Sequence, residues 1–257
     1  MYTTHIGTST PDSINIYGYD LCSEVIGHAG LADLVFLGAQ GRLPTDNESK
    51  MLNALMVGIA EHGFTPSSLS ARLTWLGAPE ATQAAVAAGL LGAGSVYLGA
   101  MELTARTLQE AWAAAPEGQR VAKTAGEVLD RFETSGEKVP GFGHPTHRPR
   151  DPRTARFFEL AEEWGFLGPH GLLLQAVHSE LERRRGKLIT LNGAGTFGAV
   201  LSDLGFGWQQ VRTVVVAARA VGLVGHIAEE AARGTADSTA QALYRHVEHH
   251  TDYQPKR

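Results

Sequence analysis

Histidines and arginines close to glycine are the side chains of this sequence that could do chemistry, and His62 is the first of them. It stands between Glu61 and Gly63, at the end of a segment with helical periodicity. A histidine there can interact favourably with the helix dipole, with Gly63 ending the helix. Alternatively, its imidazole N–H can donate a hydrogen bond to an oxygen of a ligand. The residues alone leave both interpretations open.

A second histidine, His144, lies in the most irregular part of the chain, residues 136–150, which is rich in glycine and proline. Gly141 and Gly143 precede it, and glycine lets the backbone come close to a ligand. Arg148 follows, and several cations on one loop suit an anion. A solvated basic turn would explain the same pattern equally well.

The third candidate is Arg219, which lies inside the apolar run 214–224. A cation in a buried helix is costly unless it is paired. Arg219 therefore pairs with a carboxylate of the protein or binds an anionic ligand. His226 follows seven residues later, which places it on a similar face of the helix.

Several other kinds of site have no matching motif. The sequence contains no phosphate-binding loop of the GxxxxGK[ST] type, no HExxH and no Cys/His cluster with metal-ligand spacing. We therefore predict no metal site and no tightly bound cofactor.

Most of the segments that must position these residues have helical apolar periodicity. The sequence therefore predicts an all-α fold. Extended structure is predicted only at residues 13–17 and 188–191. The apolar segment 79–115 contains several glycines, and we predict a break near Gly94–Gly99. The remaining predicted helices cover residues 48–61, 152–164, 169–185 and 208–230.

Composition excludes several classes of partner. The 257 residues carry a formal net charge of −5, so neither nucleic acid nor an anionic membrane is an expected partner. No signal peptide or uninterrupted apolar run of about 18 residues is visible, so no membrane span is expected. A single cysteine precludes an intramolecular disulfide and fits the cytoplasm. The low charged fraction of 19% suggests surface buried in an oligomer.

Five segments, in this order, resemble the citrate synthase superfamily, above all its short members, the citryl-CoA lyases. They begin with Ile16-Tyr17-Gly18-Tyr19-Asp20-Leu21 and Gly41-Arg42-Leu43-Pro44-Thr45. They continue with Glu61-His62-Gly63-Phe64-Thr65-Pro66-Ser67-Ser68, with Gly141-Phe142-Gly143-His144 before Asp151-Pro152-Arg153, and with Ala218-Arg219-Ala220-Val221-Gly222-Leu223-Val224-Gly225-His226. Each motif alone is weak, whereas five in order are strong together.

The resemblance implies roles for these residues. Histidines matching His62 and His144 bind the keto or hydroxy group of the oxaloacetate or citrate moiety, and arginines matching Arg153 and Arg219 clamp its carboxylates. His226 is added as a substrate-binding residue. The loop of Gly141, Phe142 and Gly143, with Arg148, would lie near coenzyme A. The implied partners are thus a small carboxylate and a coenzyme A thioester as substrate.

Two positions depart from the family pattern. Tyr97 stands in Gly94-Ser95-Val96-Tyr97-Leu98-Gly99, where the family often has a histidine. Ala194 stands in Asn192-Gly193-Ala194-Gly195, where the family has its catalytic aspartate. That aspartate moves the proton at the acyl-CoA α-carbon, and losing such a group typically costs about 10²–10⁴-fold in rate. Tyr97 can hydrogen-bond an enolate, so we name it as catalytic with His62 and His144.

Four functions remain open. The resemblance favours a citryl-CoA lyase-like carbon–carbon lyase acting on a hydroxy-carboxylate or hydroxyacyl-CoA. A citrate synthase-like condensing acyltransferase is the second. The third is a catalytically silent paralogue that binds a carboxylate or acyl-CoA. The fourth is a retro-aldol-type cleavage of a carboxylate without coenzyme A, which needs no α-proton base.

The resemblance also implies two helical domains and a homodimer. We predict a large domain formed by residues 1–100 and 200–257. A smaller helical domain, residues 101–199, would be inserted between its two parts and would carry His144 and Ala194.

Overall fold

The chain begins with a small antiparallel sheet. The computed structural model describes residues 2–119 and 121–255. Strands β1 (Gly7–Ser9), β2 (Ile14–Ile16) and β3 (Tyr19–Asp20) pair in that order, with Gly7 opposite Ile16. The extended structure predicted for residues 13–17 is therefore confirmed. A short π-helix, η1 (Leu21–Val25), follows.

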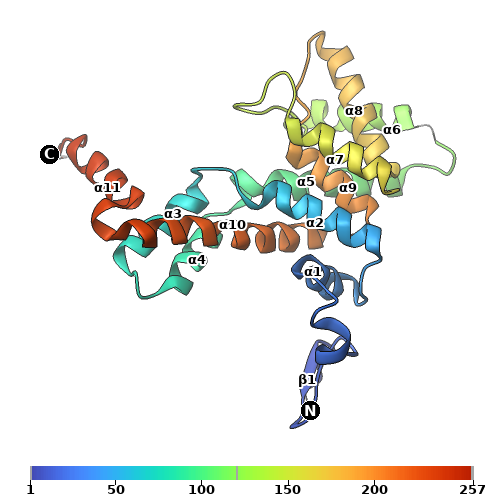
Figure 1. Cartoon of the computed structure of the whole chain (residues 1–257). Helices are drawn as coiled ribbons and strands as arrows, with labels where there is room; N and C mark the ends of the chain where they lie inside the picture. The colour runs from blue at the N-terminus through green and yellow to red at the C-terminus, as the bar shows by residue number, and fades with distance from the viewer. Residues whose placement is uncertain (1, 120, 256–257) are drawn as a thin grey trace. The chain divides into compact units, whose positions relative to one another are not determined.

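Helices form the rest of the regular structure, which confirms the predicted all-α class (Figure 1). The first five are α1 (Leu31–Gln40), α2 (Asp46–Ala60), α3 (Pro66–Gly77), α4 (Thr82–Leu91) and α5 (Ser95–Ala114). The others are α6 (Val121–Ser135), α7 (Pro152–Glu163), α8 (Pro169–Arg185), α9 (Gly193–Asp203), α10 (Trp208–Asp237) and α11 (Thr239–His249).

The predicted break in segment 79–115 exists, although it falls slightly earlier than predicted. Helix α4 ends at Leu91 and α5 begins at Ser95, so the break covers residues 92–94 and Gly99 continues the second helix. At Gly92 a Cβ would lie 3.1 Å from the Pro66 carbonyl oxygen. A residue without a side chain is therefore needed where α4 ends against the start of α3.

The described chain divides into two compact units. The first contains residues 1–58 and 99–214, and the second contains residues 59–98 and 215–257. The predicted division, with a large domain of 1–100 plus 200–257 and a small domain of 101–199, stays a prediction.

One hydrophobic core of the first unit lies where α6, α7, α8 and α9 pack together (Figure 1). Helix α8 contacts both α6 and α9, and α9 also contacts α7. The buried apolar side chains of this core include Leu129, Leu173, Leu174, Val177 and Ala199. Helices α7 and α9 are thereby fixed relative to one another, and both begin at the candidate site.

The second unit is built on helix pairs α3–α4 and α3–α11, with the later part of α10. Its apolar core contains Ala71, Trp75, Ala85, Leu223 and Ile227. At Gly89 of α4 a Cβ would lie 2.6 Å from a methyl group of Leu223, so a glycine permits the close packing of α4 on α10.

Helix α10 is the one helix in the described residues that is long and apolar enough, by length and composition, to cross a membrane. It buries Val211, Val214, Ala218 and Leu223 within the protein, and it also buries Arg219. We therefore interpret α10 as a core helix, as its apolar pattern predicts.

Candidate functional site

The glycine loop lies against the segment that leads into α9. Gly143 N donates to the Thr190 carbonyl oxygen at 2.7 Å, and Phe142 forms an antiparallel bridge with Leu191. The extended piece predicted at residues 188–191 is thus present as this single bridge. The pairing brings the loop close to Ala194 in the first turn of α9.

Two glycines make this contact possible. Gly141 has a φ of +89°, which L side chains rarely adopt, and a Cβ at Gly195 would lie 2.8 Å from the Gly141 backbone. Asn192 holds the same junction, because its Oδ1 accepts from Gly195 N at 2.9 Å and its Nδ2 donates to the Gly143 carbonyl oxygen at 2.8 Å. The N-terminus of α9 and the loop therefore form one structural unit.

His144 is held in a defined tautomer by its own loop. Its Nδ1 accepts hydrogen bonds from the backbone N–H groups of Thr146 at 3.1 Å and His147 at 3.0 Å. Because a backbone N–H can only donate, the proton of the neutral ring lies on Nε2. His144 thus has the donor atom needed to polarise a carbonyl or hydroxyl oxygen.

Arg153 is fixed by a bidentate pair with Asp151 at the start of α7. Arg153 Nε lies 3.1 Å from Oδ1 and Nη2 lies 2.8 Å from Oδ2. Asp151 also caps α7 by accepting from Arg153 N, and it accepts from Gly193 N at 2.8 Å. Burial alone would raise the pKa of Asp151, but the hydrogen bonds from Arg153 and Gly193 prevail and lower it to about 2. Nη1 of Arg153 takes no part in this pair.

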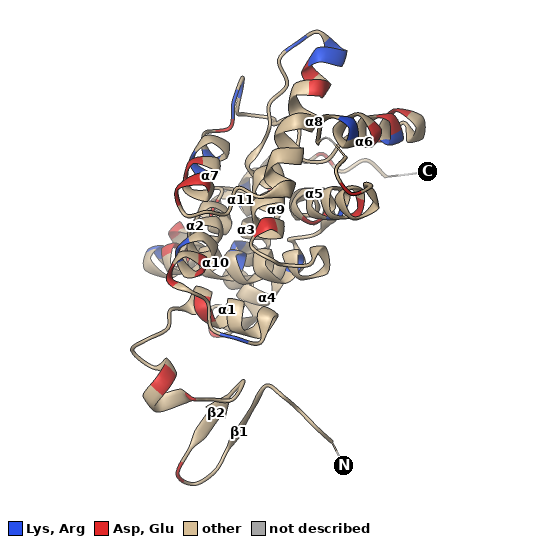
Figure 2. Cartoon of the chain, turned by 90° about the vertical axis from the view of Figure 1, so that its right-hand side faces the viewer, with Lys and Arg blue, Asp and Glu red and all other residues tan. Residues whose placement is uncertain are grey.

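A cavity of about 530 Å³ adjoins the glycine loop in the first unit. Phe142, Val139 and Ile189 contribute apolar walls, while Arg185 and Lys187 contribute cations. Figure 2 shows basic residues at the C-terminal end of α8. One of them, Arg185, lines the cavity. Further lining residues are Leu129, Phe132, Glu133, Gly136, Glu137, Lys138, Gly143 and Leu181.

In the second unit, the turn that carries His62 is tied to α10. Glu61 Oε1 accepts from Gly63 N at 2.5 Å, and Glu61 Oε2 lies 2.9 Å from Nε2 of His226. Nδ1 of His226 accepts from Arg72 Nε at 2.9 Å, so the neutral ring carries its proton on Nε2, which lies near Glu61 Oε2 without the geometry of a hydrogen bond. His226 therefore connects a buried arginine to the turn of His62.

Arg72 is the centre of a buried charge cluster that sequence reasoning missed. It pairs with Glu229 and Glu230 of α10, and its guanidinium carbon lies 5.1 Å from the centroid of the Phe64 ring. The side chains of Arg72 and Glu230 are 3% and 0% exposed. The available signal was an arginine in the otherwise uncharged helix segment 66–77, which needs a partner when buried.

The predicted site residues therefore fall into two groups. The first unit brings together Gly141, Phe142, Gly143, His144, Arg153 and Ala194, with Arg148 exposed on the same loop. The second unit holds His62, Tyr97, Arg219 and His226. Arg219 is buried in α10, whereas Tyr97 lies in the first turn of α5 and is 61% exposed. The functional roles assigned to all of these residues stay predictions.

Asp151 and Asn192 are further site residues to which the sequence analysis gave no role. Each precedes a helix as an N-cap, and Pro152 after Asp151 is typical of a first helical turn. These cap signals are visible in the sequence. Their contacts with Gly193 and Gly143, 42 and 49 residues away, are not.

The helical fold and the histidine–glycine loop define a protein of the citrate synthase-like class. Residues 28–245 match the family model described as citrate synthase, C-terminal domain, so the chain belongs to the citrate synthase family.

Known members of the family differ in how much of their length this chain matches. The chain is 29% identical to citryl-CoA lyase from Hydrogenobacter thermophilus, with a TM-score of 0.86 over 100% of this chain and 96% of that one. The ATP citrate lyase of Methanosaeta concilii, solved with (3S)-citryl-CoA, shares the fold at 18% identity, with a TM-score of 0.77 over 99% of this chain and 42% of that one. Citrate synthase of Acidithiobacillus ferridurans is 26% identical over 203 residues, which are 75% of this chain and 49% of that protein. The chain thus spans about half the length of the curated relative but nearly all of the short lyase.

Proposed function

We propose that this protein is a carbon–carbon lyase that cleaves citryl-CoA or a similar hydroxyacyl-CoA into an oxo-carboxylate and an acyl-CoA. The observation that carries the proposal is the match in fold and length to the H. thermophilus citryl-CoA lyase. The citrate synthase of A. ferridurans, by contrast, is about twice as long as the matched segment. The proposed reaction therefore follows the lyase rather than the synthase.

The first unit supports recognition of a carboxylate with a neighbouring oxygen. Asp151 orients the guanidinium of Arg153 through two of its nitrogens, so Nη1 is positioned to donate to a substrate carboxylate. Nε2 of His144 carries the proton that would stabilise negative charge developing on the substrate oxygen. A charged donor and a neutral donor on one rigid scaffold suit a hydroxy-carboxylate.

The cavity beside the glycine loop supports a coenzyme A thioester as the acyl carrier. Its apolar walls at Phe142 and Ile189 fit a nucleobase and the pantetheine chain, while Arg185 and Lys187 fit phosphate groups. The M. concilii ATP citrate lyase was solved with (3S)-citryl-CoA, which is a ligand of this class. Coenzyme A would enter and leave with each turnover rather than stay bound.

Product analysis by mass spectrometry tests the proposal. The purified protein is incubated with citryl-CoA, with acetyl-CoA plus oxaloacetate, and with hydroxy-carboxylates without coenzyme A. We expect acetyl-CoA and oxaloacetate from citryl-CoA only. Arg153→Gln should lose most of this activity through weaker substrate binding, whereas Arg156→Gln, an exposed arginine of the same helix, should not. Products from either other mixture alone would reject the lyase in favour of the condensing or the coenzyme A-independent reaction.

Ala194 favours a second candidate, a protein that binds a carboxylate or acyl-CoA without cleaving it. An alanine methyl group cannot transfer the proton that cleavage requires at the α-carbon. Citrate binding measured by calorimetry, with no product from any of the three mixtures, would support this candidate. An Ala194→Asp variant that then gains citryl-CoA cleavage would show that the rest of the site is competent.

A further inference from the structure

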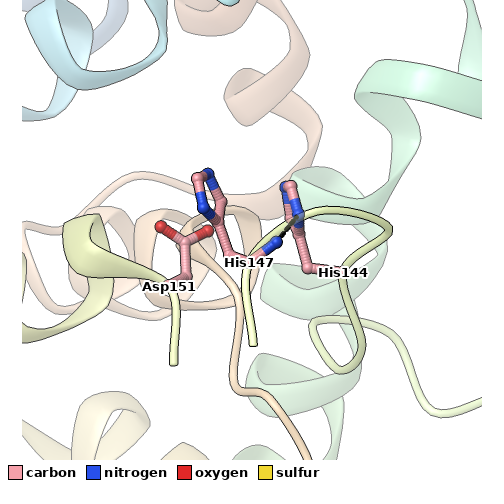
Figure 3. Close-up of side chains that lie close together, drawn as sticks. All are labelled: His144, His147 and Asp151. Atoms are coloured by element: carbon pink, nitrogen blue, oxygen red, sulfur yellow. Dashed lines mark hydrogen bonds between the residues drawn. The ribbon is translucent and has the colours of Figure 1, made fainter. Parts of the chain in front are cut away.

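The loop after His144 carries a second histidine, His147, which the sequence analysis did not single out. The two imidazole rings lie side by side, with centroids 4.4 Å apart and an interplanar angle of 31° (Figure 3). Both side chains are partly buried. The loop therefore presents two imidazoles at one place.

Asp151 completes the cluster. One side-chain nitrogen of each histidine and one oxygen of Asp151 all lie within 4.8 Å of one another (Figure 3). These distances would allow the three side chains to bind a metal ion. However, both oxygens of Asp151 already accept hydrogen bonds from Arg153, and Oδ2 accepts another from Gly193. A metal ion would have to displace the arginine, so the arrangement fits acid–base chemistry better.

The same aspartate links His147 to the position of the missing acid. Gly193 N donates to Asp151 Oδ2 at 2.8 Å, and the next residue is Ala194. The imidazole of His147 thus lies close to a carboxylate that touches the N-terminus of α9. Asp151 is ionised at neutral pH, because its pKa lies at about 2.

We propose that His147 is the acid that protonates the α-carbon of the departing acyl-CoA, in place of the carboxylate that Ala194 lacks. This inference rests on the lyase reaction proposed above. The substrate hydroxyl group loses its proton to water, and its oxygen forms the carbonyl as the carbon–carbon bond breaks. The electron pair of that bond passes to the α-carbon of the thioester as an enolate. The imidazolium of His147 gives its proton to that carbon and is reprotonated from water.

A His147→Gln variant tests this role, because an amide fills similar space but cannot transfer the proton. We expect citryl-CoA cleavage to fall about 10²–10⁴-fold in kcat, as for loss of a general acid. The dissociation constant for citrate, measured by calorimetry, should stay near the wild-type value. His246→Gln, an exposed histidine of α11, serves as the matched control and should cleave at the wild-type rate.

A double variant separates acid catalysis from a structural role. In the His147→Gln background, Ala194→Asp supplies a carboxylate at the neighbouring position and should restore part of the lost cleavage. A merely structural defect would not respond to that carboxylate, so failure to restore cleavage would overturn the proposal.

The remaining outcomes distinguish this inference from the reaction on which it rests. If wild type does not cleave citryl-CoA, the lyase proposal fails and the role of His147 fails with it. If wild type cleaves and His147→Gln cleaves equally well, only the role of His147 is wrong. A variant that loses citrate binding together with cleavage would make His147 a binding residue and would also overturn the proposal.

Discussion

Asp151 is the residue on which the candidate site of the first unit depends. It caps α7, orients the guanidinium of Arg153, accepts from Gly193 N and lies next to His147. One buried carboxylate thus joins a helix start, a candidate substrate-binding arginine and the N-terminus of a second helix. Because four hydrogen bonds converge on it, its ionisation should be linked to the stability of the protein.

Acid unfolding tests this linkage. Hydrogen bonds lower the pKa of Asp151 from 3.8 to about 2 despite its burial, so its stabilising contribution is present above pH 3.8 and lost as the pH falls towards 2. The contribution should be about 2 kcal/mol. We expect the free energy of unfolding of wild type, measured in urea, to fall by this additional amount relative to Asp151→Asn over that range.

The comparison uses the pH dependence rather than the absolute stability, since the variant is also less stable at neutral pH. Asn at position 151 leaves Arg153 without its carboxylate and does not titrate. Parallel stability curves for wild type and Asp151→Asn between pH 4 and pH 2 would contradict the assigned linkage.

At the scale of elements, the site depends on how closely α9 approaches the glycine loop. Gly141 and Gly195 meet through their backbones, and residues 143 and 190 are joined by a backbone hydrogen bond. In the second unit, α3 and α10 are joined instead by ion pairs of Arg72. The contact between α9 and the glycine loop depends on close backbone packing, whereas the contact between α3 and α10 depends on charge. The first should be sensitive to an added side-chain carbon and the second to the removal of a charge.

Gly195→Ala should destabilise the protein and reduce citrate binding. The added Cβ would lie 2.8 Å from the backbone of Gly141, which cannot move away as a flexible side chain could. We expect a loss of about 1–3 kcal/mol, which is typical of overpacking, measured by urea unfolding. Gly126→Ala is the control, because its Cβ would meet only Arg184 Nη2 at 3.6 Å and alanine favours a helix. Equal effects of the two substitutions would exclude the steric explanation.

Arg72→Met should lower the free energy of unfolding more than the loss of any exposed ion pair does. It leaves the fully buried Glu230 without its partner, and breaking a buried pair in this way typically costs about 3–5 kcal/mol. Arg233→Ala breaks a pair with Glu229 whose side chains are 49% and 43% exposed, and it should cost less than about 1 kcal/mol. Urea unfolding compares the two. The double variant Arg72→Met/Glu230→Leu should recover much of the loss, and no recovery would contradict the charge-burial argument.

At the scale of the whole molecule, the charge content and an exposed apolar face bear on the oligomeric state. Only 19% of the residues are charged, and α10 exposes the apolar side chains of Val221 and Val224 by 57% and 61%. We propose a homodimer that buries this face, in agreement with the low charge.

Light scattering after size exclusion tests the oligomeric state. At micromolar concentration, we expect a mass of twice the 27.4 kDa of one chain. Val224→Glu places a charge on the proposed interface and should shift the population towards monomer, whereas Val247→Glu on α11, also exposed, should not. A wild-type protein that elutes as a monomer would contradict the proposal.

The sequence by itself determined the helical class, most of the helix positions and the types of residue that gather at the site. These depend on local signals: apolar periodicity, proline and cap residues at helix starts, and glycines in the loop around His144. The break in segment 79–115 was predictable from its glycines, although its position at residues 92–94 was not, because it depends on the contact of Gly92 with the start of α3.

Only the tertiary structure decided which polar groups meet. Asp151 contacts Gly193 across 42 residues, and Arg72 contacts His226 across 154. From the sequence alone, Arg72 and His147 had no assigned role, and His226 was predicted only to bind substrate. A periodic pattern shows that a charge is buried on its helix, but the partner is set by which helices pack together. That packing places His147 beside Asp151, which contacts the residue that precedes Ala194.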